Sequence, residues 1–350
     1  MPMSSSTLLE ARELKKYFPI QEGAFLRKKA GWVKAVDGVS FSIRRGETVG
    51  LVGESGCGKT TTGRMLLRII EPTAGSIIYH DSSGPVDIAE LDRKELWNLR
   101  RRMQMIFQDP YSSLNPRMTV QEIVQEPLYC YGIGTVAERK ERAMEILKVV
   151  GLDPKFMSRY PHAFSGGQRQ RIGIARALIL NPEIIIADEP VSALDVSIQA
   201  QVLNLLQDLQ AQFNLTFLFI SHDLSVVEHL CDRTLVMYLG RIVEMADTEE
   251  LFDNPLHPYV ETLLSAVPRP EPGFRFDEQI LEGEAEGYQG ESKGCTFAPR
   301  CRYAKAICHE EVPELREMAS NGSSHAVRCH LAESLELKGV GSAICRDAAG

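Results

Sequence analysis

Two kinds of hydrophobic pattern alternate along the first 220 residues of this chain. Residues 33–52 alternate apolar and polar side chains around Arg45-Gly46-Glu47, which predicts two strands joined by a turn. Residues 184–187 and 215–220 are continuous apolar runs, the pattern of strands buried in a parallel sheet. Strands that alternate with helices indicate an α/β fold with a parallel sheet. The pattern predicts helices at 59–70, 121–150, 165–180 and 197–212, and a further strand at 76–80.

Proline and glycine set the expected ends of these helices. Pro72 ends the first helix, and Pro182 stops the helix that begins near Ser165. The second helical stretch is expected to break at Pro127 and again around 132–134. We predict that the helical stretch between about 109 and 165 is a subdomain inserted into the α/β core.

The composition and the hydrophobic patterning of the chain change after about residue 253. Prolines become frequent, and residues 277–293 are acidic and rich in glycine, which is the composition of a linker or loop. A segment with four cysteines follows, and the last residues are weakly patterned, as in a disordered tail. The predicted domains are a core at 1–253, a C-terminal extension at 254–334 and a tail at 335–350.

Size and charge exclude several classes of protein. The chain has 350 residues, 44% of them hydrophobic and 25% charged, which is typical of a globular protein. Its net charge of −8 offers no general basic field for nucleic acid. No apolar run approaches the ~18–20 residues that span a bilayer, and the N-terminus lacks the core of a signal peptide. We therefore expect a cytoplasmic protein without nucleic-acid partners, for which any membrane role requires partner subunits.

A phosphate-binding motif directly follows the second predicted strand. Residues 53–61 are GESGCGKTT and fit the spacing G-x-x-x-x-G-K-[ST], in which backbone N–H groups converge on phosphate oxygens at the start of a helix. Lys59 is then placed to reach the β- and γ-phosphates, and Thr60 to ligate Mg²⁺. The alternative is a glycine-rich turn with a chance lysine. The expected nucleotide-binding residues are Gly53, Glu54, Ser55, Gly56, Cys57, Gly58, Lys59, Thr60 and Thr61.

Two carboxylates end the apolar run at 184–187. Asp188 and Glu189 follow it at the carboxyl end of the predicted strand, which is where open α/β sheets bind ligands. Asp188 is placed to hold Mg²⁺, directly or through water, and Glu189 to polarise the attacking water as general base. The alternative is a strand that simply ends in exposed acids, and the phosphate loop earlier in the chain weakens that alternative.

Residues 165–171, SGGQRQR, indicate the family. By themselves they form a serine-capped, glycine-led helix start suited to anion binding. At this distance before an acidic strand end they resemble the signature of ABC-type ATPases, and the resemblance covers nearly the whole chain. It implies a P-loop ABC ATPase core with a mixed sheet, a helical insert and a small cysteine-rich extension. It also implies binding of ATP and Mg²⁺, with nucleotide contacts from Ser165, Gly166, Gly167 and Gln168.

The resemblance assigns roles to further residues. Gln108 matches the glutamine that contacts Mg²⁺ and the attacking water, and Asp195 ends the SALD motif that matches the D-loop. His222, in FISHDL, matches the switch histidine that touches the γ-phosphate. Phe18 is placed like the aromatic residue that stacks on adenine, and its neighbour Tyr17 is the alternative.

Three further stretches resemble the ATP-binding subunits of oligopeptide and dipeptide importers. They are FQDPYSSLNPRM at 107–118, NPLHPY at 254–259 and the cysteine segment at 294–330. The first of them, together with the phosphate loop, is closer to the second of the two paralogous ATPases in such systems, as found in dipeptide permeases. Val260 replaces the threonine usual after HPY, a departure outside the catalytic motifs. The implied function is ATP hydrolysis that energises the import of di- or oligopeptides.

This resemblance also implies partners and a location. In ABC ATPases the signature of one subunit closes over the phosphate loop of another, so a dimer is expected, with a paralogous ATPase or with a second copy of this chain. Two transmembrane permease subunits and an extracytoplasmic peptide-binding protein complete the expected assembly. The chain is then expected at the cytoplasmic face of the membrane as a peripheral subunit.

Four cysteines in the C-terminal extension form a candidate metal site. In a reducing compartment such a cluster favours metal over disulfides. Spacings of five, six and twenty residues fit the C-x2–4-C pairs of structural zinc poorly, and four thiolates also suit a [4Fe–4S] cluster, which the resemblance supports. Zn²⁺ and four unliganded cysteines are the alternatives. The candidate ligands are Cys295, Cys301, Cys308 and Cys329.

Two alternatives to peptide import stay open. The same subunit type serves the uptake of nickel, glutathione or antimicrobial peptides, because the binding protein and the permease choose the cargo. The other alternative is a non-transport ABC ATPase of translation or DNA repair. Such proteins usually carry two cassettes or long coiled coils, whereas this chain has one cassette, no heptad run and no basic surface.

Overall fold

The computed structural model describes residues 6–22, 28–81, 83–267, 293–318 and 324–340. The chain forms two compact units that alternate along the sequence. The first, called here the helical unit, consists of Met1–Leu8, Ile43–Glu47 and Glu90–Ile220. The second, called here the loop unit, consists of Leu9–Ser42, Thr48–Ala89 and Ser221–Gly350.

Three parallel strands form the sheet of the helical unit: β6 (Met103–Ile106), β7 (Ile184–Asp188) and β8 (Thr216–Ser221). They are hydrogen-bonded in the order β8-β7-β6, with Ile184 opposite Met103 on one side and Thr216 on the other. Every residue of β7 and β8 is buried. Because a strand covered on both faces favours apolar side chains, the two continuous apolar runs form buried parallel strands, as predicted.

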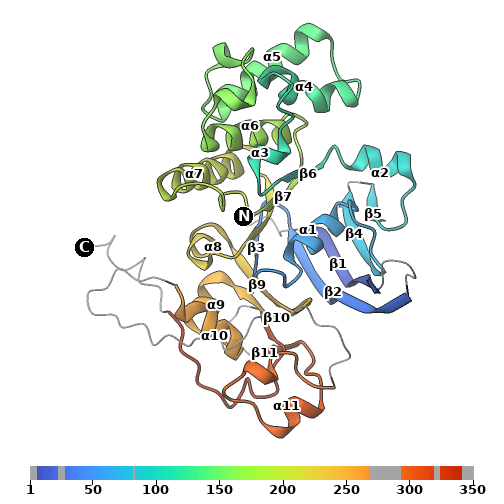
Figure 1. The fold of residues 1–350 in the computed structure, drawn as a ribbon, viewed down its shortest axis with the longest axis vertical. Helices are drawn as coiled ribbons and strands as arrows, with labels where there is room; N and C mark the ends of the chain where they lie inside the picture. Colours follow the sequence, from blue (N-terminus) through green and yellow to red (C-terminus); the bar gives the residue numbers. More distant parts are fainter. Residues whose placement is uncertain (1–5, 23–27, 82, 268–292, 319–323, 341–350) are drawn as a thin grey trace, which may run out of the picture. The chain divides into compact units, whose positions relative to one another are not determined.

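The helices of the helical unit are α2 (Arg93–Leu99), α3 (Pro110–Ser113), α4 (Val120–Cys130), α5 (Val136–Val149), α6 (Gly166–Leu178) and α7 (Val196–Phe213), with 3-10 turns η1 (Pro154–Phe156) and η2 (Pro161–Ala163). Helices α4, α5 and α6 contact one another, and they form the green part of Figure 1. The helices predicted at 165–180 and 197–212 are confirmed as α6 and α7.

The break expected at Pro127 is wrong. Helix α4 continues through Pro127 to Cys130. Ile123 and Leu128, on either side of the proline, are buried, and this packing outweighs the backbone hydrogen bond that proline cannot donate. The chain leaves the helix only after Cys130, so the break expected around 132–134 is confirmed.

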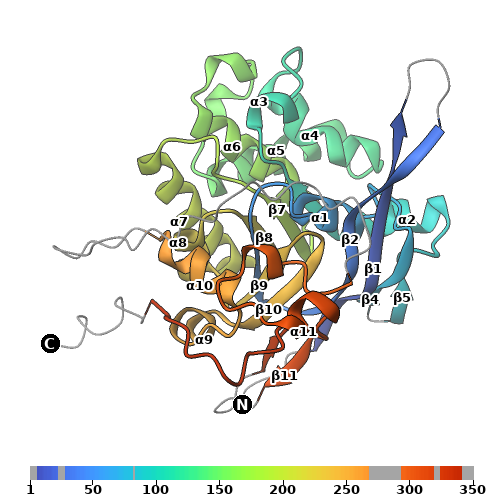
Figure 2. The same ribbon diagram turned by 60° about the horizontal axis from the view of Figure 1, so that its bottom comes forward.

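One sheet of the loop unit contains the long strands β1 (Thr7–Glu22) and β2 (Lys28–Arg44) with β4 (Ala74–Asp81) and β5 (Gly84–Asp87). Its order is β2-β1-β4-β5, and β4 runs antiparallel to both of its neighbours. Figure 2 shows the four strands side by side. The strand predicted at 76–80 is confirmed as β4, where the buried Tyr79 lies opposite the buried Leu9 of β1.

The second sheet of the loop unit is mixed. Its strands are β3 (Thr48–Val52), β9 (Arg233–Tyr238), β10 (Arg241–Asp247), β11 (Arg316–Met318) and β12 (His325–Val327). The order is β11-β12-β10-β9-β3, in which β3 and β9 are parallel and the remaining pairs antiparallel. Strands β2 and β3 are the pair predicted around Arg45-Gly46-Glu47. Strands β11 and β12 bring the C-terminal region onto this sheet.

The helices of the loop unit are α1 (Lys59–Leu66), α8 (Leu224–Leu230), α9 (Thr248–Asp253), α10 (Pro258–Ser265) and α11 (Ala306–Glu310), with the 3-10 turn η3 (Ala298–Arg300). Helix α1 is four residues shorter than predicted. Arg68 takes a left-handed φ of 49°, and the Ile69 N–H donates to Arg64 O, which ends the helix before Pro72 is reached. In the part of the chain that the structure describes, no helix has the length and apolar character needed to cross a membrane.

The C-terminal tail differs in part from the expectation of disorder. The Lys338 N–H donates to Glu261 Oε1 at 3.0 Å, and the Val340 N–H donates to Phe252 O at 2.7 Å. Residues 335–340 are therefore held against α9 and α10, whereas residues 341–350 lie outside the described part of the chain. So does nearly all of the acidic stretch 277–293. The domain boundaries at 253 and 334 stay predictions.

Candidate active site

The predicted phosphate loop turns at glycines that a larger residue cannot replace. Gly53 has a φ of 148°, and a Cβ on it would lie 2.1 Å from Met237 O. Gly58 has a φ of 110°, and its Cβ would lie 2.1 Å from Ala35 O. No side chain tolerates either contact. Close contacts with neighbouring backbone carbonyls therefore fix the loop in a tight turn, which is the geometry that anion-binding loops need.

The tight turn of the phosphate loop encloses Lys59. It is 5% exposed, and its ammonium donates to Gly53 O at 2.7 Å and to Glu54 O at 3.0 Å. Helix α1 begins at Lys59 and directs its positive end to the same place. A buried cation, a helix N-terminus and a glycine loop together suit a polyphosphate. Cys57 packs within the loop, and burial raises the pKa of its thiol.

The carboxyl end of β7 carries the predicted acidic pair. Asp188, the last residue of the strand, is 1% exposed. Glu189 follows with a φ of 46°, a left-handed backbone that costs a non-glycine residue ~1–2 kcal/mol. Gln108 Nε2 donates to Glu189 Oε2 at 2.7 Å. The structure thus brings two of the residues predicted for hydrolysis together, on a strained turn of the kind found at active sites.

The predicted signature begins helix α6. The Ser165 side chain accepts from the Gln168 N–H at 3.4 Å, and the Gln168 side chain accepts from the Ser165 N–H, which makes a reciprocal cap. Ser165 and Gln168 are exposed, so the positive end of α6 faces solvent. A Cβ on Gly167 would lie 2.3 Å from Ile198 Cγ2 of α7. This glycine is required because the predicted signature and the N-terminal turn of α7 approach closely.

The predicted D-loop and switch residues each lie just before a helix. Asp195 is the N-cap residue of α7 and is exposed, with no capping bond from its side chain. His222 is exposed and lies between β8 and α8. The next residue, Asp223, caps α8 by accepting from the Ser225 N–H at 2.9 Å. Both candidate residues therefore stand on turns whose backbone is set by the following helix.

The structure distinguishes the two candidate aromatic residues. The Tyr17 hydroxyl donates to Asp37 Oδ1, and Asp37 is also paired with Arg241 at 2.7 Å. Burial and this hydrogen bond raise the pKa of Tyr17 to about 12. Phe18, by contrast, is 38% exposed, with the Lys16 ammonium 5.1 Å from its ring centroid. Phe18 is therefore the more exposed of the two rings.

Three of the four candidate metal ligands gather in one small core of the C-terminal region, and Cys301 interacts electrostatically with them. Cys308 and Cys329 are buried there, and Cys295 packs against them. Burial and the neighbouring thiols raise the pKa of Cys295 and Cys301, and raise that of Cys329 to about 11. Such a donor set suits a metal that thiolates hold. Among the described residues, however, no group of three or more His, Cys, Asp or Glu side chains is arranged to hold a metal ion.

Sequence reasoning missed the contacts that hold Glu54 in the phosphate loop. Arg300 Nη1 donates to both Glu54 carboxylate oxygens, at 2.9 and 3.2 Å. The Glu54 N–H donates to the Tyr259 hydroxyl at 2.9 Å. Arg300 lies 246 positions away in the chain, so no local spacing reports the pair. Only the sign of the charges was visible in the sequence.

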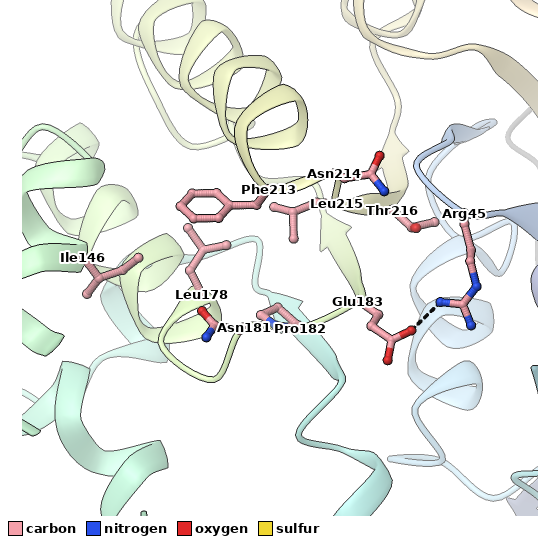
Figure 3. A pocket seen from close by; sticks show the side chains of 10 residues that line it. All are labelled: Arg45, Ile146, Leu178, Asn181, Pro182, Glu183, Phe213, Asn214, Leu215 and Thr216. Carbon is pink, nitrogen blue, oxygen red and sulfur yellow. Dashed lines mark hydrogen bonds and ion pairs between the residues drawn. The ribbon is translucent and has the colours of Figure 1, made fainter. Parts of the chain in front are cut away.

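A pocket of about 320 Å³ lies at the other end of the strands of the helical unit. Glu183 and Thr216, at the amino ends of β7 and β8, line it together with Phe213 and Leu178 (Figure 3). Arg45 closes one side through an ion pair with Glu183. Ligands of α/β sheets bind at the carboxyl ends of strands, so this pocket is distinct from the predicted nucleotide chemistry at Asp188.

Two family models match the chain. The ABC transporter model matches residues 36–192, which include the phosphate loop, the signature and the acidic pair. The model of the oligopeptide/dipeptide transporter C-terminal region matches residues 243–308, which include the HPY turn and three of the four clustered cysteines.

Individual proteins agree with these models. The oligopeptide transport ATP-binding protein AppF of Bacillus subtilis (strain 168) is 55% identical over 331 residues, which cover 94% of this chain and 98% of the relative. A putative peptide import ATP-binding protein of Brucella ovis is 54% identical over 316 residues, 90% of this chain and 96% of the relative.

Solved structures show the same fold. The dimeric structure of MJ0796, a bacterial ABC transporter cassette, has a TM-score of 0.60 at 30% identity and covers 69% of this chain and 99% of that one. The cbiO1 protein from Clostridium perfringens has a TM-score of 0.59 at 26% identity and covers 70% of this chain and 90% of that one. The predicted ABC ATPase fold is thereby confirmed. The chain belongs to the ABC transporter family, as an ATP-binding subunit that carries the C-terminal region of oligopeptide/dipeptide transporters.

Proposed function

We propose that this ABC ATPase energises the import of di- or oligopeptides, as a peripheral subunit at the cytoplasmic face of a membrane transporter. One observation carries the proposal. The same chain matches the cassette model over 36–192 and the oligopeptide/dipeptide C-terminal model over 243–308. The relative from Bacillus subtilis, an oligopeptide transport ATP-binding protein, is matched over 98% of its length, so the likeness covers both parts together.

In the proposed reaction each predicted residue has an assigned role. Lys59 neutralises the β- and γ-phosphates, and Glu189 takes a proton from the attacking water. The 2.7 Å hydrogen bond from Gln108 Nε2 to Glu189 Oε2 orients the carboxylate for that proton transfer. Thr60, Gln108 and Asp188 would hold Mg²⁺, which offsets the negative charge of the phosphates when bound.

We further propose that the exposed start of α6 serves the nucleotide of a second ATPase subunit. Ser165 and Gln168 are exposed, and their cap leaves the positive end of the helix open to an anion from outside. Gly166, Gly167 and Asp195 belong to the same face of the proposed contact. His222 and Phe18 would complete the site at the γ-phosphate and the adenine. A paralogous ATPase and a second copy of this chain are both candidate partners.

Exposed aromatic residues support a docking role for the segment around Gln108. Phe107 is 37% exposed and Tyr111 is 60% exposed, and the Arg169 guanidinium lies 4.1 Å from the centre of the Tyr111 ring. Aromatic residues of this kind are enriched in protein interfaces. We propose that two permease subunits contact this segment, and that an extracytoplasmic peptide-binding protein delivers the cargo to them.

For the C-terminal region we propose that Cys295, Cys301, Cys308 and Cys329 hold a [4Fe–4S] cluster, with Zn²⁺ as the alternative. The shared small core and the mutual effect of the thiols on their pKa values support a common ligand. We expect Cys301→Ser to lose the metal and keep ATP binding. Iron and zinc analysis of the purified protein tests this. Unchanged content of both metals in Cys301→Ser would contradict the site, and zinc without iron would select the alternative.

Peptide uptake tests the proposed cargo. Lys59→Ala, introduced in the chromosome of the source organism so that neighbouring genes are spared, is expected to abolish uptake of labelled di-, tri- or pentapeptides. Lys155→Ala is the matched control, because that lysine is exposed and pairs only locally with Asp153. Loss of nickel or glutathione uptake alone would keep the mechanism and change the cargo. Normal uptake of every compound in both strains would contradict a transport role for this chain in those cells.

A further inference from the structure

Glu54 is an acid inside a loop whose task is to bind phosphates. A triphosphate carries several negative charges, and an unpaired carboxylate in the same loop would repel it. The structure pairs this carboxylate with Arg300 through Nη1 at 2.9 and 3.2 Å. The side chains of Arg300 and Glu54 are only 12% and 24% exposed, so solvent screens the pair incompletely.

The Glu54 backbone is held as firmly as its side chain. Its N–H donates to the Tyr259 hydroxyl at 2.9 Å, and its carbonyl accepts from Lys59 Nζ at 3.0 Å. Tyr259 is fully buried and belongs to α10, in the region that the oligopeptide/dipeptide model matches. The contacts with Arg300 and Tyr259 therefore tie Glu54 to the C-terminal region.

A cluster of packed aromatic side chains supports the guanidinium of Arg300. Arg300 ends the turn η3, which follows the buried Phe297. Phe297 packs edge-on against Tyr238, with ring centroids 5.3 Å apart, and its ring is tilted against that of Tyr259 at 5.4 Å. Arg300 Nη1 also contacts the Tyr238 hydroxyl at 3.4 Å. These contacts hold the positive charge beside the phosphate loop.

We propose that Arg300, supported by Tyr259, is a positioning residue for the phosphate loop and sets its affinity for ATP by neutralising Glu54. Through this contact the C-terminal region acts directly on the nucleotide site of its own chain. The proposal rests on nucleotide binding by the ABC ATPase and is independent of the transported cargo.

Opposite changes of charge test this role. Equilibrium binding of a fluorescent ATP analogue with Mg²⁺ is measured on the full-length chain. Arg300→Met leaves one uncompensated negative charge and is expected to weaken binding about fivefold. Glu54→Gln leaves one uncompensated positive charge and is expected to tighten it by a similar factor. The double variant is expected to return to the parent affinity, and the two single effects are expected to shrink as salt is raised.

Arg302→Met is the matched control, since Arg302 lies in the same segment and pairs with Glu261 at 3.0 Å. Its affinity is expected to match the parent. The melting temperature of each variant is measured alongside. Equal affinity of Arg300→Met and the parent would overturn the proposal, and so would weakened binding in both single variants, because a merely structural pair fails from either side. If Arg300→Met does not fold, tighter binding by Glu54→Gln supports the proposal and weaker or unchanged binding rejects it.

Discussion

The candidate nucleotide-binding residues are held in different ways in the two units. In the loop unit the phosphate loop is closed and internally bonded, with Lys59 buried and its ammonium held by two carbonyls of the loop itself. In the helical unit Gln108, Ser165 and Asp195 are exposed at the ends of secondary-structure elements. The candidate site of the loop unit is therefore shaped by backbone packing, whereas the helical unit presents its candidate side chains on turns.

This difference has a physical reason. Binding a highly charged phosphate is strongest when the donors are already in place, because no ordering cost is then paid on binding. The roles predicted for Gln108, Ser165 and Asp195 instead require groups that meet the substrate when an assembly closes, and exposed positions suit such roles. Glu189 combines features of both groups, because its backbone is strained and its side chain accepts a hydrogen bond from Gln108.

The largest effect is expected at the helical unit. Glu189→Gln keeps the size of the side chain and removes its basicity, so turnover is expected to fall roughly 10²–10⁴-fold while nucleotide binding persists. Phosphate release and nucleotide binding measure the two quantities. Glu183→Gln is the control, since that carboxylate lies at the other end of β7 and pairs with Arg45. Normal hydrolysis by Glu189→Gln would remove the general-base role.

The loop unit is expected to lose stability in acid through His257. This side chain is 1% exposed, and burial lowers its pKa to about 3. The unfolded chain takes up the proton below about pH 6.5 and the folded chain does not, so this residue costs about 1.4 kcal/mol of unfolding free energy per pH unit between about 6.5 and 3. Above about pH 6.5 neither state takes up this proton, so His257 no longer lowers the unfolding free energy.

His257→Asn isolates this effect. Asparagine can still accept the Tyr259 N–H, which His257 Nδ1 accepts at 3.1 Å, but it does not titrate. Urea unfolding from pH 7.5 to 4.5 is expected to show a shallower acid loss in the variant than in the parent, because the remaining carboxylates are shared by both. Parallel stability curves for the two proteins would contradict a neutral, buried histidine.

Two glycines of α6 separate packing from helix propensity. Gly167→Ala would place a Cβ 2.3 Å from Ile198 Cγ2 and is expected to cost ~1–3 kcal/mol of unfolding free energy. Gly173→Ala, in the same helix, meets nothing within 4 Å and is expected to stabilise by ~0.5–1 kcal/mol. Denaturant unfolding measures both. Equal changes in the two variants would show that α6 and α7 do not pack closely at the signature.

The smallest effect is expected at the aromatic pair. Phe18→Ala removes the exposed ring and is expected to weaken ATP binding by roughly fivefold, about 1 kcal/mol of stacking. Tyr17→Phe keeps the ring and loses only the bond to Asp37, so nucleotide affinity is expected to stay near that of the parent. A greater loss of affinity in Tyr17→Ala than in Phe18→Ala would transfer the adenine contact to Tyr17.

The local motifs of this protein were determined by the sequence alone. The phosphate loop, the strand that ends in Asp188 and the Ser165 cap of α6 could each be predicted, because the spacing of motif residues and the local hydrophobic pattern encode them. The family followed from the same short stretches. The roles of the individual site residues stay predictions, which the experiments above test.

Only the tertiary structure decided the rest. Packing around Ile123 and Leu128 keeps α4 helical through Pro127, and Asp37 engages Tyr17 while leaving the Phe18 ring exposed. The contact of Arg300 with Glu54 joins residues 246 positions apart. Such contacts depend on how strands and helices pack, so no local pattern in the chain predicts them.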